Sequence, residues 1–306
     1  MPGVREPAVA GRFYDRDPER LIASLRQCFL HPLGPGSLPR AAADGPGRIA
    51  AVVSPHAGYM YSGPAAAHSF HALAADGVPD TVIILGPSHY ASDRRAALSP
   101  ASAWRTPLGE VQVDEDLRRE LLERCRLLVA DERAHRLEHS LEVQVPFLQF
   151  IYGERMPSIC PICVRSHPLS ASDQLLADAA EIGQALAEAL AARRGVVVAS
   201  TDLSHQMPQV EAERLDRLAL DAVLAVNSEQ LLRTVAELSI SMCGPVPVAI
   251  ALLFCQARLR QDAGLAEGRK LEAQLLRYYT SGDIIGDRSA VVGYASVAIA
   301  RPVGKG

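Results

Sequence analysis

The chain has 306 residues, of which 48% are hydrophobic and 22% are charged. This is the composition of a folded globular protein, and it excludes an intrinsically disordered chain, which needs fewer apolar residues and a larger net charge. The net charge is −4, from 31 basic and 35 acidic residues. A general nucleic-acid-binding protein would carry a basic excess, so no nucleic-acid partner is expected.

No stretch of the sequence predicts a membrane span or a secretion signal. The longest apolar run, over residues 246–255, is far shorter than the roughly 20 residues of a spanning helix, and the N-terminus lacks the apolar core of a signal peptide. We therefore expect a cytoplasmic protein with no membrane partner, in which the six cysteines are mostly reduced. The six thiols and nine histidines are then candidates for core packing, metal binding or nucleophilic chemistry.

Apolar runs alternate with helical patterns along the chain. The N-terminal region predicts an extended lead-in, then a helix over 21–30 with Asp17 as its N-cap and Pro18 at its first position, then a loop over 31–48. Later helices are expected over residues 64–75, 114–124, 140–151, 171–192, 210–226, 228–236 and 245–258. Strands are expected over residues 49–54, 81–85, 158–164, 195–200, 271–280 and 289–300.

The order of these elements predicts a single α/β domain over residues 1–306, onto which residues 1–48 pack. Uninterrupted Val and Ile runs between helices are typical of a sheet that helices cover on both faces and that is largely parallel at its centre. No helix separates the last two strands, so they are expected to pair antiparallel and make the sheet mixed. The sequence has no linker, internal repeat or low-complexity segment that would indicate a second domain.

Polar residues follow three of the apolar strands at the point where each strand ends. His56 follows the first of these strands, His89 follows the second, and Asp202 and His205 follow the strand that ends at Ser200. In an open α/β sheet, the ligand crevice lies outside the carboxyl ends of the strands. We therefore expect these four side chains to meet at one edge of the sheet, although a single loop histidine is more often an ordinary surface residue.

Cys243 lies directly before the apolar helix that Pro245 begins. The exposed N–H groups and the dipole of a helix N-terminus favour a thiolate, the form that binds metals or attacks an electrophile. The alternative is a small cysteine buried in a tight turn. Histidine and thiolate ligands suit zinc, iron or copper better than magnesium or calcium. Three protein ligands with one open position would indicate a catalytic centre rather than a structural one.

The segment over residues 138–142 adds another histidine. Glu138 and Glu142 are four residues apart and would share a helical face, with Ser140 as the N-cap. His139 is then expected to act as an acid or base, or to form a hydrogen bond to a metal ligand. The alternative is a helix start whose polar groups are satisfied by contacts with the backbone.

Other motifs carry less weight. Cys160 and Cys163 have the C-x-x-C spacing of redox and zinc motifs, but they lie inside an apolar strand, so we interpret them as core residues. The sequence contains no P-loop, no Gly-x-Gly-x-x-Gly and no Gly-x-Ser-x-Gly. It therefore lacks the usual motifs of nucleotide-dependent phosphoryl transfer, of a Rossmann dehydrogenase and of a serine hydrolase.

Seven sequence blocks follow one another in a characteristic order. They are PHAGYMYSG (55–63), LGPSHY (85–90), W-x-TPLGEV-x-VD (104–114), EHSLEVQVPFL (138–148), STDLSH (200–205), CGPVPVAIAL (243–252) and YYTSGDIIGD (278–287). Together they resemble the Memo family, whose bacterial and archaeal members are called AmmeMemoRadiSam system protein B. The resemblance covers nearly the whole chain.

This resemblance implies a fold similar to that of the class III extradiol dioxygenases, which use non-haem Fe(II). It implies that His56, His89 and Cys243 bind iron or copper, with zinc as a further candidate, and that Asp202 and His205 line the same cleft. In those dioxygenases a carboxylate completes a two-histidine triad. A thiolate in its place disfavours ring cleavage and favours a redox role for the metal. The bacterial name implies a radical-SAM protein and an AMMECR1-like protein as pathway partners.

Three functions stay open at this point. In the first, the protein is a metal-dependent redox enzyme in which His139 or His205 is the acid or base and Asp202 is a ligand or orienting residue. In the second, it is a non-catalytic scaffold that binds a metal and recognises a peptide or small molecule. The aromatic residues that would line its cleft are Tyr59, Tyr61, Tyr90 and Trp104. In the third, it is a hydrolase or transferase with Cys243 as the nucleophile and His205 or His89 as the base.

Overall fold

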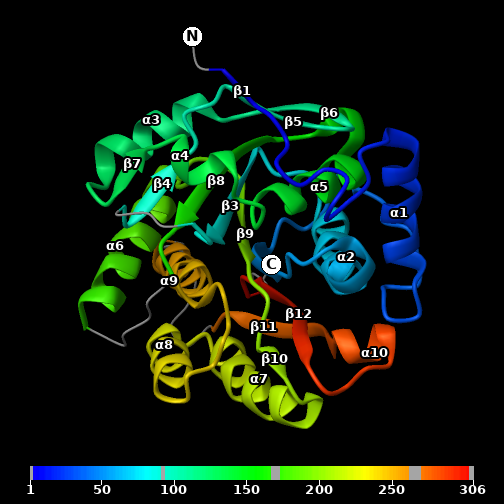
Figure 1. Ribbon diagram of the computed structural model, residues 1–306. Coiled ribbons are helices and arrows are strands. Elements are labelled where there is room, and N and C mark those ends of the chain that lie inside the picture. The colour runs from blue at the N-terminus through cyan, green and yellow to red at the C-terminus, as the bar shows by residue number, and fades with distance from the viewer. Residues whose placement is uncertain (1–2, 91–93, 167–172, 262–269, 303–306) are drawn as a thin grey trace.

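A mixed sheet of nine strands crosses the middle of the described part of the protein (Figure 1). The computed structural model describes residues 3–90, 94–166, 173–261 and 270–302. The strand order is β10-β12-β2-β9-β3-β8-β4-β7, and β11 also pairs with β12. The bounds are β2 Ile49–Ser54, β3 Thr81–Pro87, β4 Ala96–Leu98, β7 Leu128–Ala130, β8 Ser158–Val164, β9 Gly195–Ser200, β10 His205–Met207, β11 Glu272–Thr280 and β12 Val291–Ala300.

The centre of this sheet is parallel, and an antiparallel pair lies on each side of it, β12 with β2 and β4 with β8. Strands β2, β9, β3 and β8 pair parallel with one another. Strand β12 runs antiparallel to β2, and β11 runs antiparallel to β12. The predicted single α/β domain with a largely parallel, mixed sheet is therefore confirmed, including the antiparallel pair at the C-terminal end of the chain.

Helices cover both faces of the sheet (Figure 1). Helices α1, α2 and α5 pack on one face, and α3, α6, α7, α8 and α9 pack on the other. No helix in the described ranges is long and apolar enough to cross a membrane. The bounds are α1 Pro18–Leu30, α2 Tyr59–Asp76, α3 Glu115–Arg124, α4 Arg133–Arg136, α5 Val145–Tyr152, α6 Asp173–Ala189, α7 Gln209–Leu224, α8 Ser228–Glu237, α9 Pro245–Gln261 and α10 Ser281–Ile285.

Strand β3 shows how one apolar run supplies both halves of the core. All its residues are buried; Ile83 and Leu85 pack on one face, and Val82 and Ile84 on the other. Each such side chain stabilises the fold by about 1.5–3 kcal/mol relative to an exposed position. This period of two explains why residues 82–85 of a strand buried on both faces form an uninterrupted apolar run.

The same period separates the two cysteines of the C-x-x-C spacing. Cys160 and Cys163 lie in β8 and are buried on opposite faces of the sheet. Residues three apart in a strand point in opposite directions, so these thiols cannot hold one metal ion or form a disulfide. Their interpretation as core residues agrees with this burial.

The helix starts predicted at Pro18, after Asp114, at Ser228 and at Pro245 are confirmed, and those predicted at residues 64 and 140 are wrong. Asp17 caps α1 by accepting the backbone N–H of Arg20 at 3.0 Å, and Asp114 caps α3 in the same way. The helix predicted over 64–75 already begins at Tyr59, and Pro64 lies inside it. The N-terminal part of the helix predicted over 171–192 falls partly outside the described residues, and α6 ends at Ala189.

Ser140 is not an N-cap. Residues Glu142–Gln144 form a short 3-10 helix, and α5 begins only at Val145, with Pro146 in its first turn. Proline is tolerated there because the first N–H groups of a helix have no intrahelical partner. The Ser140 hydroxyl instead donates to the carbonyl oxygen of Pro87 at 3.0 Å.

A second, three-stranded sheet joins the N-terminus to the rest of the fold. Its strands are β1 Val4–Arg5, β5 Ala103–Thr106 and β6 Gly109–Gln112, and β1 runs parallel to β5. Strands of two to four residues are too short to show a hydrophobic period. The sequence pattern therefore does not predict this sheet, nor the short elements β4, β7, β10, α4 and α10.

Candidate metal centre

The carboxyl edge of the parallel strands collects the polar residues that the sequence singles out. His56 follows β2, His89 follows β3, and Asp202 and His205 follow β9. Cys243 precedes α9, and its Sγ lies 3.1 Å from Nε2 of His56. The structure thus brings loops that are up to 187 residues apart to one edge of the sheet.

Three histidines at this edge stand close enough together to share a metal ion. One ring nitrogen from each of His56, His89 and His139 lies within 4.8 Å of the other two. The rings of His89 and His139 stack with centroids 4.5 Å apart, and His56 stands edge-on to both, at 5.3 and 5.4 Å. Within the described residues, no other group of three His, Cys, Asp or Glu side chains is as compact. We call this group the three-histidine cluster.

Hydrogen bonds fix the ring of His56 so that Nε2 carries the free lone pair. The Ser200 hydroxyl donates to the carbonyl oxygen of Ser140 at 2.7 Å and lies 2.9 Å from Nδ1 of His56. Because this hydroxyl has one proton and uses it on Ser140, Nδ1 of His56 is the donor. Burial, with a smaller effect of the neighbouring histidines, lowers the pKa of His56 well below its usual value. The ring is therefore neutral, and Nε2 can bind a metal.

Glu138 orients His89 by a similar set of hydrogen bonds. Its fully buried carboxylate accepts the backbone N–H of His89 at 2.7 Å and lies 2.9 Å from Nδ1 of that ring. It also accepts the backbone N–H groups of His139 and Ser140, at 2.9 and 2.8 Å. Burial acts to raise the pKa of Glu138, but these hydrogen bonds and the His89 ring lower it to about 2. The carboxylate is ionised, Nδ1 of His89 donates to it, and Nε2 is left for a metal.

The approach of Glu138 to His89 requires a glycine near the end of β3. A Cβ atom on Gly86 would lie 2.6 Å from Oγ of Ser140 and 3.0 Å from a side-chain carbon of Leu141. Only a residue without Cβ allows a backbone approach this close. The glycine therefore lets the segment that carries Glu138 pack directly against the strand.

His139, which the sequence predicts as an acid or base, supplies the third ring of the cluster. Burial lowers the pKa of His139 to about 4, against the opposite influence of Glu138, so the ring is neutral at neutral pH. The side chains of His89 and His139 are 32% and 17% exposed, whereas His56 is 2% exposed. The cluster therefore opens to solvent on the side of His89.

Cys243 lies at the edge of the three-histidine cluster. Its Sγ accepts the backbone N–H of Asp202 at 3.1 Å and faces Nε2 of His56 at the same distance. The prediction of a thiolate is wrong for this environment, because burial, and then Asp202, raise the pKa of Cys243 well above its usual value. Nearly complete removal from solvent outweighs the effect of the helix N-terminus. A sulfur atom thus stands beside the imidazoles as a thiol.

Asp202 and His205 flank the cluster on the loop after β9. Oδ1 of Asp202 accepts the backbone N–H of His56 at 2.7 Å, so this carboxyl positions the loop that carries His56. Burial raises the pKa of Asp202 to about 6. Nδ1 of His205 lies 2.9 Å from the carbonyl oxygen of Ser241 and donates to it. Neither side chain belongs to the three-histidine cluster.

The aromatic residues expected to line a cleft have different surroundings. Trp104 is 1% exposed and its Nε1 donates a buried hydrogen bond. Tyr59 is 3% exposed and its hydroxyl donates to the carbonyl oxygen of Val143 at 2.7 Å. The polar ends of both side chains therefore find partners inside the protein, and Tyr59 also forms part of the wall of a groove. Tyr90 is 48% exposed, and Tyr61 lines a groove next to the cluster.

This groove has a volume of about 490 Å³. Phe13 forms part of its wall and packs against His139, with ring centroids 4.6 Å apart. The rest of the lining is Gly11, Arg12, Tyr14, Asp15, Arg16, Arg20, Ser24, Gly58, Tyr59, Met60 and Tyr61. A ligand in this groove would lie beside the histidines without filling the metal position.

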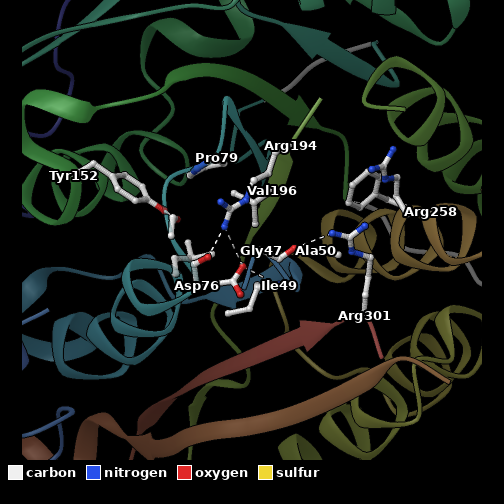
Figure 2. A pocket seen from close by; sticks show the side chains of 14 residues that line it. Gly47, Ile49, Ala50, Asp76, Pro79, Tyr152, Arg194, Val196, Arg258 and Arg301 are labelled. Carbon is white, nitrogen blue, oxygen red and sulfur yellow. Dashed lines mark hydrogen bonds and ion pairs between the residues drawn. The ribbon is translucent and has the colours of Figure 1, made fainter. Parts of the chain in front are cut away.

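A second cavity lies at the opposite, amino-terminal edge of the same strands. It holds about 30 Å³ and is lined by residues from the starts of β2 and β9 and from nearby loops (Figure 2). Arg194 donates to the carbonyl oxygen of Asp76. The Asp76 carboxylate accepts the backbone N–H groups of Arg48 and Ile49, at 2.8 and 3.0 Å. These polar groups hold the chain where β2 begins.

The sequence pattern alone misses the residues that orient the histidines. Glu138 stands directly before His139, but the pattern suggests a shared helical face with Glu142 rather than a hydrogen bond to His89. Ser200 is the last residue of a predicted strand, which is a signal for the ligand edge. Nothing in the pattern marks Phe13.

Comparisons with known proteins agree over the whole chain. The family model described as Memo-like protein matches residues 5–298. A MEMO1 family protein of Methanopyrus kandleri is 42% identical over 97% of this chain and 99% of its own length. The MEMO1 family protein of Methanothermobacter thermautotrophicus is 41% identical over 96% of this chain and 100% of its own length. That of Methanocaldococcus jannaschii is 40% identical over 98% and 100%.

Proposed function

This chain belongs to the Memo family, and we propose that it is a metal-binding protein whose three-histidine cluster holds iron or copper. The observation that carries this proposal is the geometry of His56, His89 and His139, whose ring nitrogens lie within 4.8 Å of one another. Ser200 and Glu138 occupy Nδ1 of two of these rings and leave each Nε2 for the metal. Neutral imidazoles suit iron, copper and zinc, and the family resemblance favours iron or copper.

We propose Cys243 as a further ligand of the same ion. Its Sγ is 3.1 Å from Nε2 of His56, so both atoms stand on the same side of the site. The set predicted from the sequence, His56, His89 and Cys243, then shares two members with the three-histidine cluster. A sulfur ligand beside imidazoles favours copper and iron over hard cations.

For the activity, we propose a metal-dependent oxidoreductase. The cluster is exposed on the side of His89 and closed on the side of His56, which leaves one side of a bound ion open, as in catalytic sites. A bound iron or copper ion would supply redox chemistry there. His205 and Asp202 lie on the adjacent loop and are the candidates for moving a proton. The substrate would be a small molecule or peptide in the groove beside Phe13.

Partners are proposed from the family alone. The name of its bacterial members links them to a radical-SAM protein and an AMMECR1-like protein, and we propose both as pathway partners of this chain. Co-purification of tagged protein with either one would support this link.

The contact between Cys243 and His56 favours a second candidate function, a cysteine-dependent hydrolase or transferase. A thiol 3.1 Å from a neutral imidazole nitrogen has the spacing of a nucleophile and its base. The base would then be His56 rather than His205 or His89. Cys243 is only 6% exposed, which disfavours attack on a substrate and supports the metal centre as the first proposal.

Metal analysis of protein purified anaerobically without chelator tests the main proposal. We expect one iron or copper ion per chain in the unmodified protein and none in His89→Ala. His71→Ala is the matched control, because His71 lies on α2 outside the three-histidine cluster and its Nε2 lies 3.1 Å from the hydroxyl of Ser37. Absence of bound metal in the unmodified protein, even after incubation with Fe(II) or Cu(II), would contradict the metal centre.

Alkylation with iodoacetamide near neutral pH separates the two candidates. For a metal centre, labelling of Cys243 should be slow and should stop when metal is added. Rapid labelling that metal does not block would favour the nucleophile.

A further inference from the structure

Residues 4–14, which we call the N-terminal strap, contact two of the three chain segments that carry the histidines of the cluster. On one side, the carbonyl oxygen of Phe13 accepts the backbone N–H of Tyr59 at 2.8 Å, three residues after His56. The Phe13 ring packs against His139 on the other side. In Figure 1 the strap runs from β1 toward α1.

Arg5 fastens the strap to the segment that carries Glu138 and His139. Its guanidinium pairs with the carboxylate of Glu142, and both side chains are nearly inaccessible, at 4% and 0% exposed. Two further N–H groups donate to the carbonyl oxygen of His135, at 3.1 and 2.9 Å, and one donates to the carbonyl oxygen of Glu138 at 2.7 Å. A planar guanidinium has the fork of donors that these acceptors require, and a lysine ammonium does not.

Glu142 completes the attachment along the strap. Its carboxylate accepts the backbone N–H groups of Ala8 and Val9, at 2.8 and 3.0 Å, and the Tyr14 hydroxyl at 2.6 Å. Together with Arg5, these donors occupy both carboxylate oxygens of a residue only three positions from His139. The strap and the segment 138–142 therefore behave as one packed unit.

From these contacts we infer that the N-terminal strap sets the spacing of the metal ligands, with Arg5 and Phe13 as positioning residues. The strap joins the loop after His56 to the segment that presents His139 and, through Glu138, orients His89. The separation between His56 and the other two rings is thus fixed through the strap as well as through the sheet. This inference rests on the proposed metal centre.

Binding of Co(II) tests the inference with two readouts. Affinity comes from competition with a chromophoric chelator, and the d–d absorption spectrum reports the number and arrangement of the ligands. We expect Arg5→Lys and Phe13→Leu to bind Co(II) about 10–100-fold more weakly, the range typical of residues behind metal ligands, and to change the spectrum. Arg233→Lys is the matched control, because Arg233 pairs with Glu229 at the surface of α8 and has no contact with the strap in that pair.

The outcomes separate the inference from the proposed function. Unchanged affinity and spectrum in both variants, with Co(II) bound by the unmodified protein, would overturn the inference and leave the metal centre in place. No Co(II) binding by the unmodified protein would overturn both. Thermal unfolding followed by circular dichroism checks that each variant folds, and Phe13→Leu decides the question if Arg5→Lys does not fold.

Discussion

Polar side chains lie at both ends of the parallel strands β2, β9 and β3, but the two groups differ in how their polar atoms are hydrogen-bonded. At the carboxyl end, His56 and His89 each use Nδ1 on a protein partner, and Nε2 of His56 faces Sγ of Cys243 at 3.1 Å. At the amino end, Arg194 and Arg301 donate to carbonyl oxygens of their own chain (Figure 2). The cavity between them holds about 30 Å³, about the share of liquid volume of one water molecule.

The difference shows that the density of charged groups does not identify a binding site. The amino end has more charged groups, yet their donors and acceptors form hydrogen bonds with the loops that lead into the strands. At the carboxyl end, one ring nitrogen from each of the three histidines of the cluster lies within 4.8 Å of the other two. Atoms that are oriented by the protein but not satisfied by it are what a ligand can use.

The largest expected effect comes from removing one of the three imidazole rings of the cluster. His139→Ala should weaken Fe(II) or Cu(II) binding by more than about 100-fold, beyond the range typical of residues behind the ligands, as measured by titration calorimetry. Cys243→Ser should weaken it less. If Cys243→Ser caused the greater loss, the thiolate set predicted from the sequence would describe the centre better than the three-histidine cluster.

His135 sharpens the comparison, because it is a fully buried histidine of the same region whose Nε2 contacts the backbone and which does not belong to the three-histidine cluster. Its Nε2 lies 2.9 Å from the carbonyl oxygen of Ala97, and burial lowers the pKa of His135 to about 4. The unfolded state binds this proton near pH 6.5, so the stabilisation is complete above pH 6.5 and is lost as the pH falls to 4. The loss should be about 3 kcal/mol.

Urea unfolding between pH 7 and 4 measures this loss. In His135→Gln, which does not titrate, the free energy of unfolding should fall less over that range than in the unmodified protein. Equal pH dependence in the two proteins would show that His135 is not held neutral in the fold. Metal affinity at neutral pH should be the same in both.

Glu138→Gln tests the orienting role at the carboxyl end. The single amide oxygen of glutamine can accept hydrogen bonds from only some of the four N–H groups that the carboxylate accepts. The NH₂ group of glutamine would face the remaining N–H donors and could not accept from them. Metal affinity should fall by about 10–100-fold, measured by chelator competition. Glu229→Gln, in an exposed ion pair with Arg233 on α8, should leave the affinity unchanged. Full affinity in Glu138→Gln would remove Glu138 from the site.

The smallest effect is expected at the amino end. Asp76→Ala removes the acceptor of two backbone N–H groups, and should lower the free energy of unfolding by about 2 kcal/mol, as is typical for hydrogen bonds to a charged group. Metal affinity should not change, because this edge lies at the far end of the strands. A matching loss of metal affinity would break the division between the two edges.

Patterns in the sequence predict the elements that carry the site better than the site itself. Strands β2, β8 and β9 are predicted with their observed bounds, because their apolar runs are flanked by clear breaks. Helix α2 starts five residues before the predicted start, because Pro64 lies inside the helix and does not mark its beginning. The segment that carries His139 packs against Gly86 and Arg5, which are remote in sequence. Such long-range contacts leave no periodic signal.

The four N–H groups that Glu138 accepts also bear on how fast a metal ion would leave. One carboxylate ties the backbone and ring of His89 to the backbone of His139, so these two ligands cannot swing away independently. Release of the ion would then require both rings to move together with residues 138–140. The metal should therefore dissociate more slowly than from other sites of equal affinity. The carboxylate of Glu138 would then affect the dissociation rate more than the equilibrium constant.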